Sequence, residues 1–332
     1  MKVLCLGNNN KLTDDMTHRL ADLSQSINRG LLSEIEQPID YCNLESLPDG
    51  FYHTSVLDVN NAGIKTLASW ADKIIVLDQP VDQWNHPDEY FATNYLALEF
   101  GNKVIWQNQS SRDQIEYWTN LVKKNKSFCI FPFIELLTNN NHTTVCCRSN
   151  TPVTEIKNLK NFATDPHYTV IRDAMLYGKK LPKHCEFCYT LENKNITSAR
   201  QQESVEWAIR LNLKSIDDLG SIHKPVYYEV RPSNVCNISC RICGPKSSSK
   251  IEKEYKDLGW ISHNKTVSYS NFDIVDTQGI KKLYVAGGEP TAMPEFYDFL
   301  QKCIDRKDTG FEILVNTNAV KITEKLLRLI DK

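Results

Sequence analysis

Three cysteines lie close together in the stretch NVCNISCRICGP, at Cys236, Cys240 and Cys243. Thiolates grouped in this way bind a metal ion or an iron–sulfur cluster. A structural zinc site is closed by four ligands, yet residues 244–246 are Gly, Pro and Lys. A four-iron cluster held by three thiolates keeps one iron open to a further ligand. The missing fourth thiol therefore favours a cluster that a bound small molecule completes.

Two other chemically notable stretches follow, each at the end of a predicted strand. The run IKKLYVAGGEP ends in Gly287, Gly288 and Glu289, and the run FEILVNTNA ends in Asn316-Thr317-Asn318. The strand pattern PVYYEV precedes the cysteines in the same way. Ligand sites of βα repeats lie at the carboxyl ends of the strands. We therefore expect all three stretches to lie at ligand-binding strand ends.

Helical patterns alternate with these strands. SSSKIEKEYKDLG follows the cysteines, with serines ahead of it as caps. PEFYDFLQKCIDR follows the glycines and begins at Pro294, and ITEKLLRLIDK follows the third strand. The predicted order of residues 223–332 is therefore βαβαβα.

These residues resemble the radical S-adenosylmethionine (radical SAM) enzymes, whose signature is a CxxxCxxC stretch after the first strand. The resemblance implies that Cys236, Cys240 and Cys243 ligate three irons of a [4Fe-4S] cluster and that SAM chelates the fourth. It further implies reductive cleavage of SAM to a 5′-deoxyadenosyl radical, which abstracts hydrogen from a substrate. The cysteines would then be the catalytic residues.

The same resemblance implies further contacts to SAM. Gly287 and Gly288 would expose backbone to its methionyl group, and Glu289 would bind its ammonium. Asn316 and Asn318 would be polar contacts to SAM or to the substrate, although solvated residues at a strand end are the alternative.

The chain departs from the family pattern at three points. Ile242, which would pack on the adenine, stands where an aromatic residue is frequent, and Ala319 stands where glycine is frequent. The family barrel usually has six βα units, and residues 223–332 supply three of them. We expect the chain to be a C-terminally truncated fragment. Completion by a partner, or a degenerate cluster-binding protein, are the alternatives.

Five further cysteines fall in the middle of the chain, and Cys185 and Cys188 form a CxxC pair. Such a pair is a redox couple, half of a zinc site or half of a cluster site. The best candidates for the other ligands are Cys129 and one of Cys146 and Cys147, because adjacent side chains diverge on an extended backbone. Inert buried thiols are the alternative.

This region resembles the SPASM or twitch domain, which holds an auxiliary cluster in many radical SAM enzymes that modify peptides. The resemblance rests on FCIFPF, VCC and HCEFCYTLENKNITSARQ, and implies electron relay or substrate contact. Here the region precedes the predicted barrel, as in a group of proteins encoded largely by phages and environmental bacteria. That order argues against a peptide substrate, so a small molecule is the alternative to a peptide.

We expect an α/β protein with three domains. Residues 1–127 would be a small α/β sheet domain of unknown role, residues 128–222 an irregular Cys-rich domain, and residues 223–332 a partial radical SAM barrel. In the first domain, strands are predicted at 2–7, 73–80 and 103–108, and helices at 63–72 and 88–101.

Composition narrows the functional classes. The 332 residues carry a formal net charge of −2, which gives no electrostatic basis for binding nucleic acid or a membrane surface. No apolar run approaches the roughly 20 residues of a membrane-spanning helix. We therefore expect a cytoplasmic protein with reduced thiols. The resemblance to radical SAM enzymes further implies an electron donor such as flavodoxin or ferredoxin. Cys5, Cys42 and Cys303 stand alone and are predicted to be buried core residues.

Two other functional classes remain open. One is a non-catalytic module that binds iron–sulfur or zinc and recognises a partner. The other is a carrier or nucleotide-binding protein in which residues 1–127 do the work. Neither class explains the Gly-Gly-Glu and Asn-Thr-Asn stretches at the ends of the next two strands.

Overall fold

The computed structural model describes most of the chain beyond residue 109. The described residues are 2–7, 50–55, 61–77, 95–101, 103–106, 109–139, 141–149, 151–262, 271–308 and 310–331. The chain divides into two compact units. Unit 1 comprises Met1–Ile130 and Cys188–Leu219, and unit 2 comprises Phe131–Phe187 and Gly220–Lys332.

Unit 1 contains a parallel sheet, in the part of the chain for which the sequence predicts a small α/β sheet domain. Its strand order is β2-β1-β3-β4, and every pair is parallel. The elements are β1 (Lys2–Gly7), β2 (Gly50–Ser55), α2 (Asn61–Trp70), β3 (Lys73–Leu77) and β4 (Val104–Trp106). The strand β2 was not predicted, because GFYHTS is short and only weakly apolar.

Two helices pack against each other in unit 1, α4 (Gln109–Lys124) and α8 (Ala199–Arg210). Trp118 of α4 is fully buried, and its indole N–H donates to the Leu213 carbonyl at 2.7 Å. Arg200 of α8 is also buried and donates to the Phe128 carbonyl at 2.6 Å. Its charge is balanced by Glu192 at 2.8 Å. Residues 188–219 therefore share a core with the chain before residue 130.

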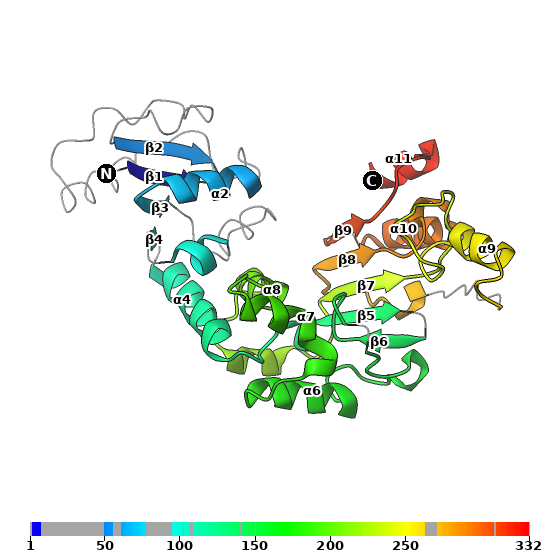
Figure 1. Cartoon of the computed structure of the whole chain (residues 1–332), viewed down its shortest axis with the longest axis horizontal. Helices are drawn as coiled ribbons and strands as arrows, with labels where there is room; N and C mark the ends of the chain where they lie inside the picture. Colours follow the sequence, from blue (N-terminus) through cyan, green and yellow to red (C-terminus); the bar gives the residue numbers. More distant parts are fainter. Residues whose placement is uncertain are drawn as a thin grey trace. The chain divides into compact units, whose positions relative to one another are not determined.

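Unit 2 is built on a five-stranded sheet in the order β6-β5-β7-β8-β9 (Figure 1). The pairs β5·β7, β7·β8 and β8·β9 are parallel, and β5·β6 is antiparallel. The strands are β5 (Glu135–Asn139), β6 (His142–Thr144), β7 (Tyr227–Arg231), β8 (Lys282–Val285) and β9 (Glu312–Val315).

The predicted βαβαβα order of the last segment is confirmed. The helices after β7, β8 and β9 are α9 (Ser249–Asp257), α10 (Pro294–Arg306) and α11 (Glu324–Ile330). Side-chain caps begin two of them: Ser248 Oγ accepts from the Ile251 N–H, and Thr323 Oγ1 accepts from the Leu326 N–H.

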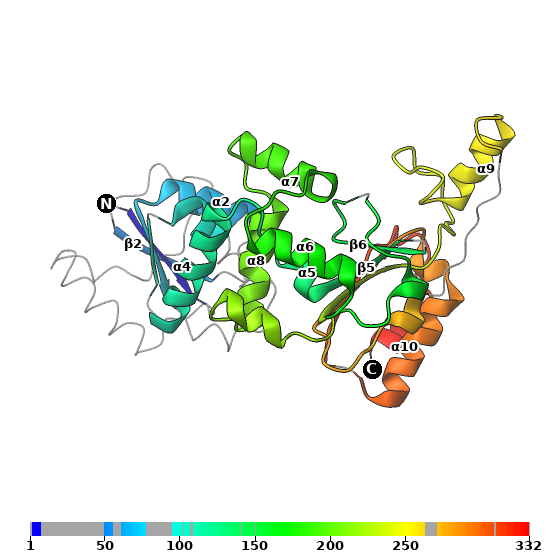
Figure 2. The ribbon, with the colours of Figure 1, turned by 90° about the horizontal axis from the view of Figure 1, so that it is seen from below.

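The two faces of this sheet differ in chemistry because successive side chains point to opposite faces. One face contributes Tyr228, Val230, Leu283 and Val285 to the core, where they pack with residues of α10. Figure 2 shows the helix α10 beside this sheet. The other face carries Glu229, which is buried and paired with Arg231 at 2.6 Å. Central strands of parallel sheets are usually apolar on both faces. Packing of the sheet therefore does not explain why β7 carries a buried carboxylate paired with a half-buried arginine.

The middle of the chain is more regular than the sequence analysis predicts. It contains α6 (Pro166–Leu176), α7 (Pro182–Asn193) and α8, and β5 and β6 join the same sheet as β7. The sequence of β5 shows no alternation of polar and apolar residues, because four of its five residues are buried. A run of that kind is not told from a loop or a helix by periodicity.

Candidate functional site

The three cysteines lie in the loop between β7 and α9, and all three are half-buried. The Cys243 N–H donates to the Cys240 carbonyl at 3.1 Å, which closes a turn between them. Burial raises the pKa of Cys243, and the nearby thiols of Cys240 and Cys236 raise it further. Cys236 and Cys240 therefore lie near enough to Cys243 to affect its ionisation, and the role of the three as cluster ligands stays a prediction.

Among the residues that the structure describes, no three His, Cys, Asp or Glu side chains converge on one metal position. This does not count against a cluster, because three thiolates on a four-iron cluster each bind a different iron. The donor set, three cysteines in a partly exposed loop, fits a [4Fe-4S] cluster with one open iron.

Hydrogen bonds to the start of α9 hold the cysteine loop in place. The Cys236 N–H donates to Ser249 Oγ at 3.1 Å, and the Ser249 N–H donates to the Asn234 carbonyl at 2.6 Å. The buried Asn234 side chain donates to the Pro245 carbonyl at 2.9 Å, which ties the two ends of the loop together. Asn234 could not be predicted as part of the site, since an asparagine beside a cysteine stretch carries no signal of its own.

The double glycine lies directly against this loop. The Gly288 N–H donates to the Ser233 carbonyl at 2.9 Å, and the Glu289 N–H donates to the Val235 carbonyl at 2.7 Å. A Cβ on Gly288 would stand 2.0 Å from the Val235 oxygen. Gly287 has φ +115°, and a Cβ there would stand 2.8 Å from the Ser233 oxygen. The absent side chains therefore make room for the chain's own backbone, and their contact with SAM stays a prediction.

Glu289 is almost fully buried, and the protein itself supplies donors to both carboxylate oxygens. Oε1 accepts from the Thr291 N–H at 3.0 Å and from the hydroxyls of Thr291 and Thr317 at 2.6 Å each. Oε2 accepts from the Asn318 N–H at 2.7 Å. Burial pushes the pKa of Glu289 up, but these hydrogen bonds outweigh it and hold the pKa below its ordinary value. Glu289 thus joins the end of β8 to the end of β9, and its predicted bond to the SAM ammonium stays a prediction.

The third predicted stretch also reaches the cysteines. Asn318 Nδ2 donates to Asn237 Oδ1 at 2.8 Å and lies 4.0 Å from the Cys236 sulfur. The side chain of Asn316 is exposed, while its N–H donates to the Val285 carbonyl at 2.9 Å. Ile242 is 97% exposed, so its surface is open to a ligand.

The five other middle-region cysteines are divided between the units. Cys129 and Cys188 belong to unit 1, and Cys146, Cys147 and Cys185 belong to unit 2. Cys185 and Cys188 lie one turn apart on α7, and both are buried. Burial, followed by the charges of Glu229 and Glu135, raises the pKa of Cys147 to about 11. The auxiliary site stays a prediction.

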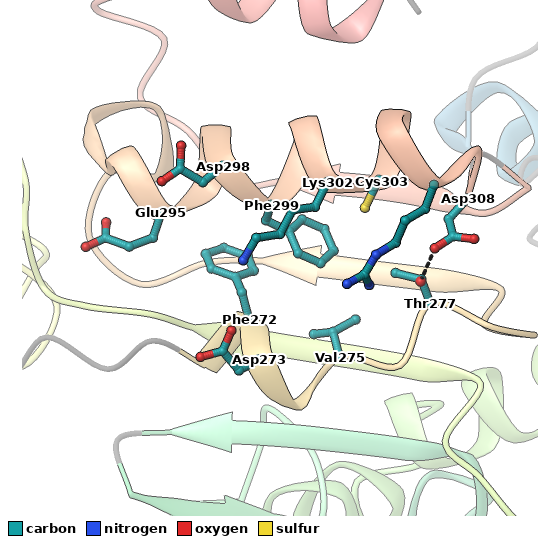
Figure 3. Close-up of a pocket in the computed structure, with 11 residues that line it drawn as sticks. Phe272, Asp273, Val275, Thr277, Glu295, Asp298, Phe299, Lys302, Cys303 and Asp308 are labelled. Atoms are coloured by element: carbon teal, nitrogen blue, oxygen red, sulfur yellow. Dashed lines mark hydrogen bonds between the residues drawn. The ribbon is translucent and has the colours of Figure 1, made fainter.

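A pocket of about 340 Å³ lies between α10 and residues 272–277 (Figure 3). It is bounded by acidic and basic side chains, and Thr277 donates to Asp308 at 2.6 Å. None of the predicted site residues lines it. Cys303 is part of its wall and is buried in the core, as predicted. Cys42 and the side chain of Cys5 lie outside the described part of the chain.

Comparison with known proteins finds a match for one part of the chain. Residues 230–332 match a family model described as the Radical SAM superfamily. We call this segment the radical SAM domain. A domain of this kind implies a [4Fe-4S] cluster and SAM, and it indicates an enzyme. No curated protein and no solved structure matches the chain. No helix in the described ranges is long and apolar enough to cross a membrane.

Proposed function

We propose that this chain is a radical SAM enzyme with Cys236, Cys240 and Cys243 as its cluster ligands. When bound to these cysteines, the cluster and SAM would supply one-electron reductive cleavage of SAM and radical hydrogen abstraction from the substrate. The protein's part is to hold the cofactors, orient the substrate and exclude water.

One observation carries this proposal: the stretches after three neighbouring parallel strands meet around the cysteine loop. Gly288 after β8 lies against Val235, and Asn318 after β9 reaches Cys236. These stretches stand about 50 and 80 residues apart from the cysteines in sequence. A chance cysteine triplet would not require glycine and asparagine at the two neighbouring strand ends.

Other residues have roles that follow from their positions. We assign the exposed Ile242 to the adenine of SAM, and Asn316 to SAM or the substrate. The polar sheet face with Glu229 and Arg231 lies on β7, the strand that leads into the cysteine loop. We assign this face to the wall of the substrate-binding site. A polar wall would explain why a charge pair lies on a strand of a kind that is usually apolar on both faces.

We also propose an auxiliary iron–sulfur or zinc site of the SPASM or twitch kind, with Cys129, Cys185 and Cys188 as ligands. The remaining candidate is one of the adjacent pair Cys146 and Cys147. Such a site would relay electrons or contact a peptide or small-molecule substrate. Because thiolate clusters need a reducing compartment, we place the protein in the cytoplasm, with a flavodoxin or ferredoxin as donor.

The test is anaerobic reconstitution of the chain with iron and sulfide, followed by dithionite and SAM. The products are assayed for 5′-deoxyadenosine by mass spectrometry. The parent and Cys303→Ala, which removes a core thiol outside the loop, should both form it, and Cys240→Ala should not. A cluster that forms while SAM stays intact in the parent would favour the non-catalytic binding module, and stoichiometric zinc without iron would refute the cluster.

A further inference from the structure

The turn after β9 is ordered by its own side chains. Thr317 Oγ1 accepts from the Ala319 N–H at 3.0 Å, and Asn318 Oδ1 accepts from the Val320 N–H at 3.0 Å. Ala319 adopts φ +52°, a left-handed conformation that costs a non-glycine residue about 1–2 kcal/mol. The turn keeps this conformation because the surrounding hydrogen bonds over-determine it.

Glu289 fixes this turn to the neighbouring strand. Its carboxylate accepts from the Thr317 hydroxyl at 2.6 Å and from the Asn318 N–H at 2.7 Å. Since Glu289 is 1% exposed, water does not compete for these bonds. The carboxylate of Glu289 therefore holds the backbone of Asn318 in place, and the Asn318 side chain has little freedom to turn away from Cys236.

The orientation of the Asn318 amide follows from its partners. The Val320 N–H is a donor and must face the amide oxygen, which leaves the NH₂ group facing Asn237 and Cys236. Asn237 Oδ1 takes one N–H at 2.8 Å, and the sulfur of Cys236 lies 4.0 Å from the same nitrogen. On its other side, the Cys236 backbone is anchored to Ser249.

We propose that Asn318 is a positioning residue that points an amide N–H at the sulfur of Cys236 and thereby raises the reduction potential of the cluster. An N–H dipole beside a ligating sulfur stabilises negative charge, and a cluster gains one negative charge when it accepts an electron. Glu289 acts through Asn318 by holding its backbone. This inference rests on the proposed function, because it takes Cys236 as a cluster ligand.

The test measures the potential of the cluster without SAM. The full chain and its variants are reconstituted anaerobically, their iron and sulfide are counted, and the reduced cluster is followed by EPR during titration with dithionite. Asn318→Ala removes the donor. Asn318→Asp keeps the size of the side chain and the acceptor for Val320, but replaces the donor by a negative charge. Val320→Ala is the control from the same turn, since its side chain is exposed and its N–H, which contacts Asn318, is kept.

We expect the midpoint to become more negative in Asn318→Ala and still more so in Asn318→Asp, at parent levels of iron. A tenfold change in the equilibrium constant of a one-electron reduction corresponds to 59 mV. We expect the shift of the midpoint in Asn318→Ala to be at most this large, because the N···S distance is long. Val320→Ala should keep the parent midpoint.

A parent midpoint in both Asn318 variants at full iron content would overturn the inference alone. Loss of the cluster from both variants, with unfolding curves like that of the parent, would also overturn it, because Asn318 would then serve to retain iron. Absence of a four-iron signal in the parent would overturn the proposed function and this inference together.

Discussion

The contact between Gly288 and the cysteine loop gives the sharpest prediction for a single substitution. In Gly288→Ala the new Cβ would stand 2.0 Å from the Val235 oxygen and 2.7 Å from the Asn234 carbonyl carbon. A Cβ atom essentially never lies closer than 3.0 Å to a heavy atom of another residue, and here the atoms in the way belong to the backbone. The loop must therefore move by about 1 Å. Overpacking of this kind lowers the free energy of unfolding by about 1–3 kcal/mol.

That movement would also stretch two hydrogen bonds, from Gly288 to Ser233 and from Glu289 to Val235. Each contributes about 1 kcal/mol. We expect Gly288→Ala to lower the free energy of unfolding by about 3 kcal/mol, and to reduce iron loading because Cys236 follows Val235 directly.

The assay is urea unfolding of the metal-free chain, together with iron counting after reconstitution. Gly244→Ala is the matched control, because Gly244 belongs to the same loop and a Cβ there meets nothing within 4 Å. It should stay within about 0.5 kcal/mol of the parent. If Gly288→Ala unfolds and binds iron like Gly244→Ala, the packing of the double glycine against the loop is wrong.

Three further predictions concern the sheet and its ends. Ala319→Gly should raise the free energy of unfolding by about 0.5–1 kcal/mol, since relief of the left-handed strain exceeds the added chain entropy, and a lower value would contradict this. Glu289→Gln should cost stability above pH 4.5, its ordinary pKa, and the difference from the parent should shrink as the pH falls through the lowered pKa of the folded state; a pH-independent difference would refute it. Arg231→Met should cost roughly 3 kcal/mol in urea unfolding because it strands the buried Glu229, whose pKa burial already raises. That cost should be smaller at pH 5 than at pH 8, because a protonated carboxyl needs no counter-charge.

The radical SAM domain could be predicted from local signals. Each of its strands is a short apolar run that ends in polar or glycine residues, and α10 begins at Pro294 as the sequence indicates. Ser248 caps α9, as the serines ahead of that helix indicated, whereas the cap at Thr323 was not predicted. In this segment local preference and tertiary packing agree, so periodicity was a sufficient guide.

The middle of the chain was harder to predict, although one signal was present. Ser198 and Gln201 form a capping box at the start of α8, a pattern that the sequence shows as S-x-x-Q. The strand β5 had no such signal. Its burial depends on pairing with β7, about 90 residues later in the chain, and only the folded sheet brings that pairing about.

The roles of the site residues stay predictions, and the sequence did not indicate their local contacts. A sequence indicates that Gly288 needs space, yet it does not tell whether a ligand or the backbone of Val235 fills that space. In the same way, the carboxylate of Glu289 reads as a ligand for a cation, while in the structure Thr317 and Asn318 hold it. Such contacts join strand ends that lie far apart in sequence.

The central claim is that the cysteine loop carries a cluster that cleaves SAM, and formation of 5′-deoxyadenosine tests it most directly. The parent chain, reconstituted without oxygen and reduced with dithionite, should convert SAM into 5′-deoxyadenosine and methionine, and Cys240→Ala should form neither. Equal product from the parent and Cys240→Ala, or intact SAM in a parent that holds four irons per chain, would contradict the account.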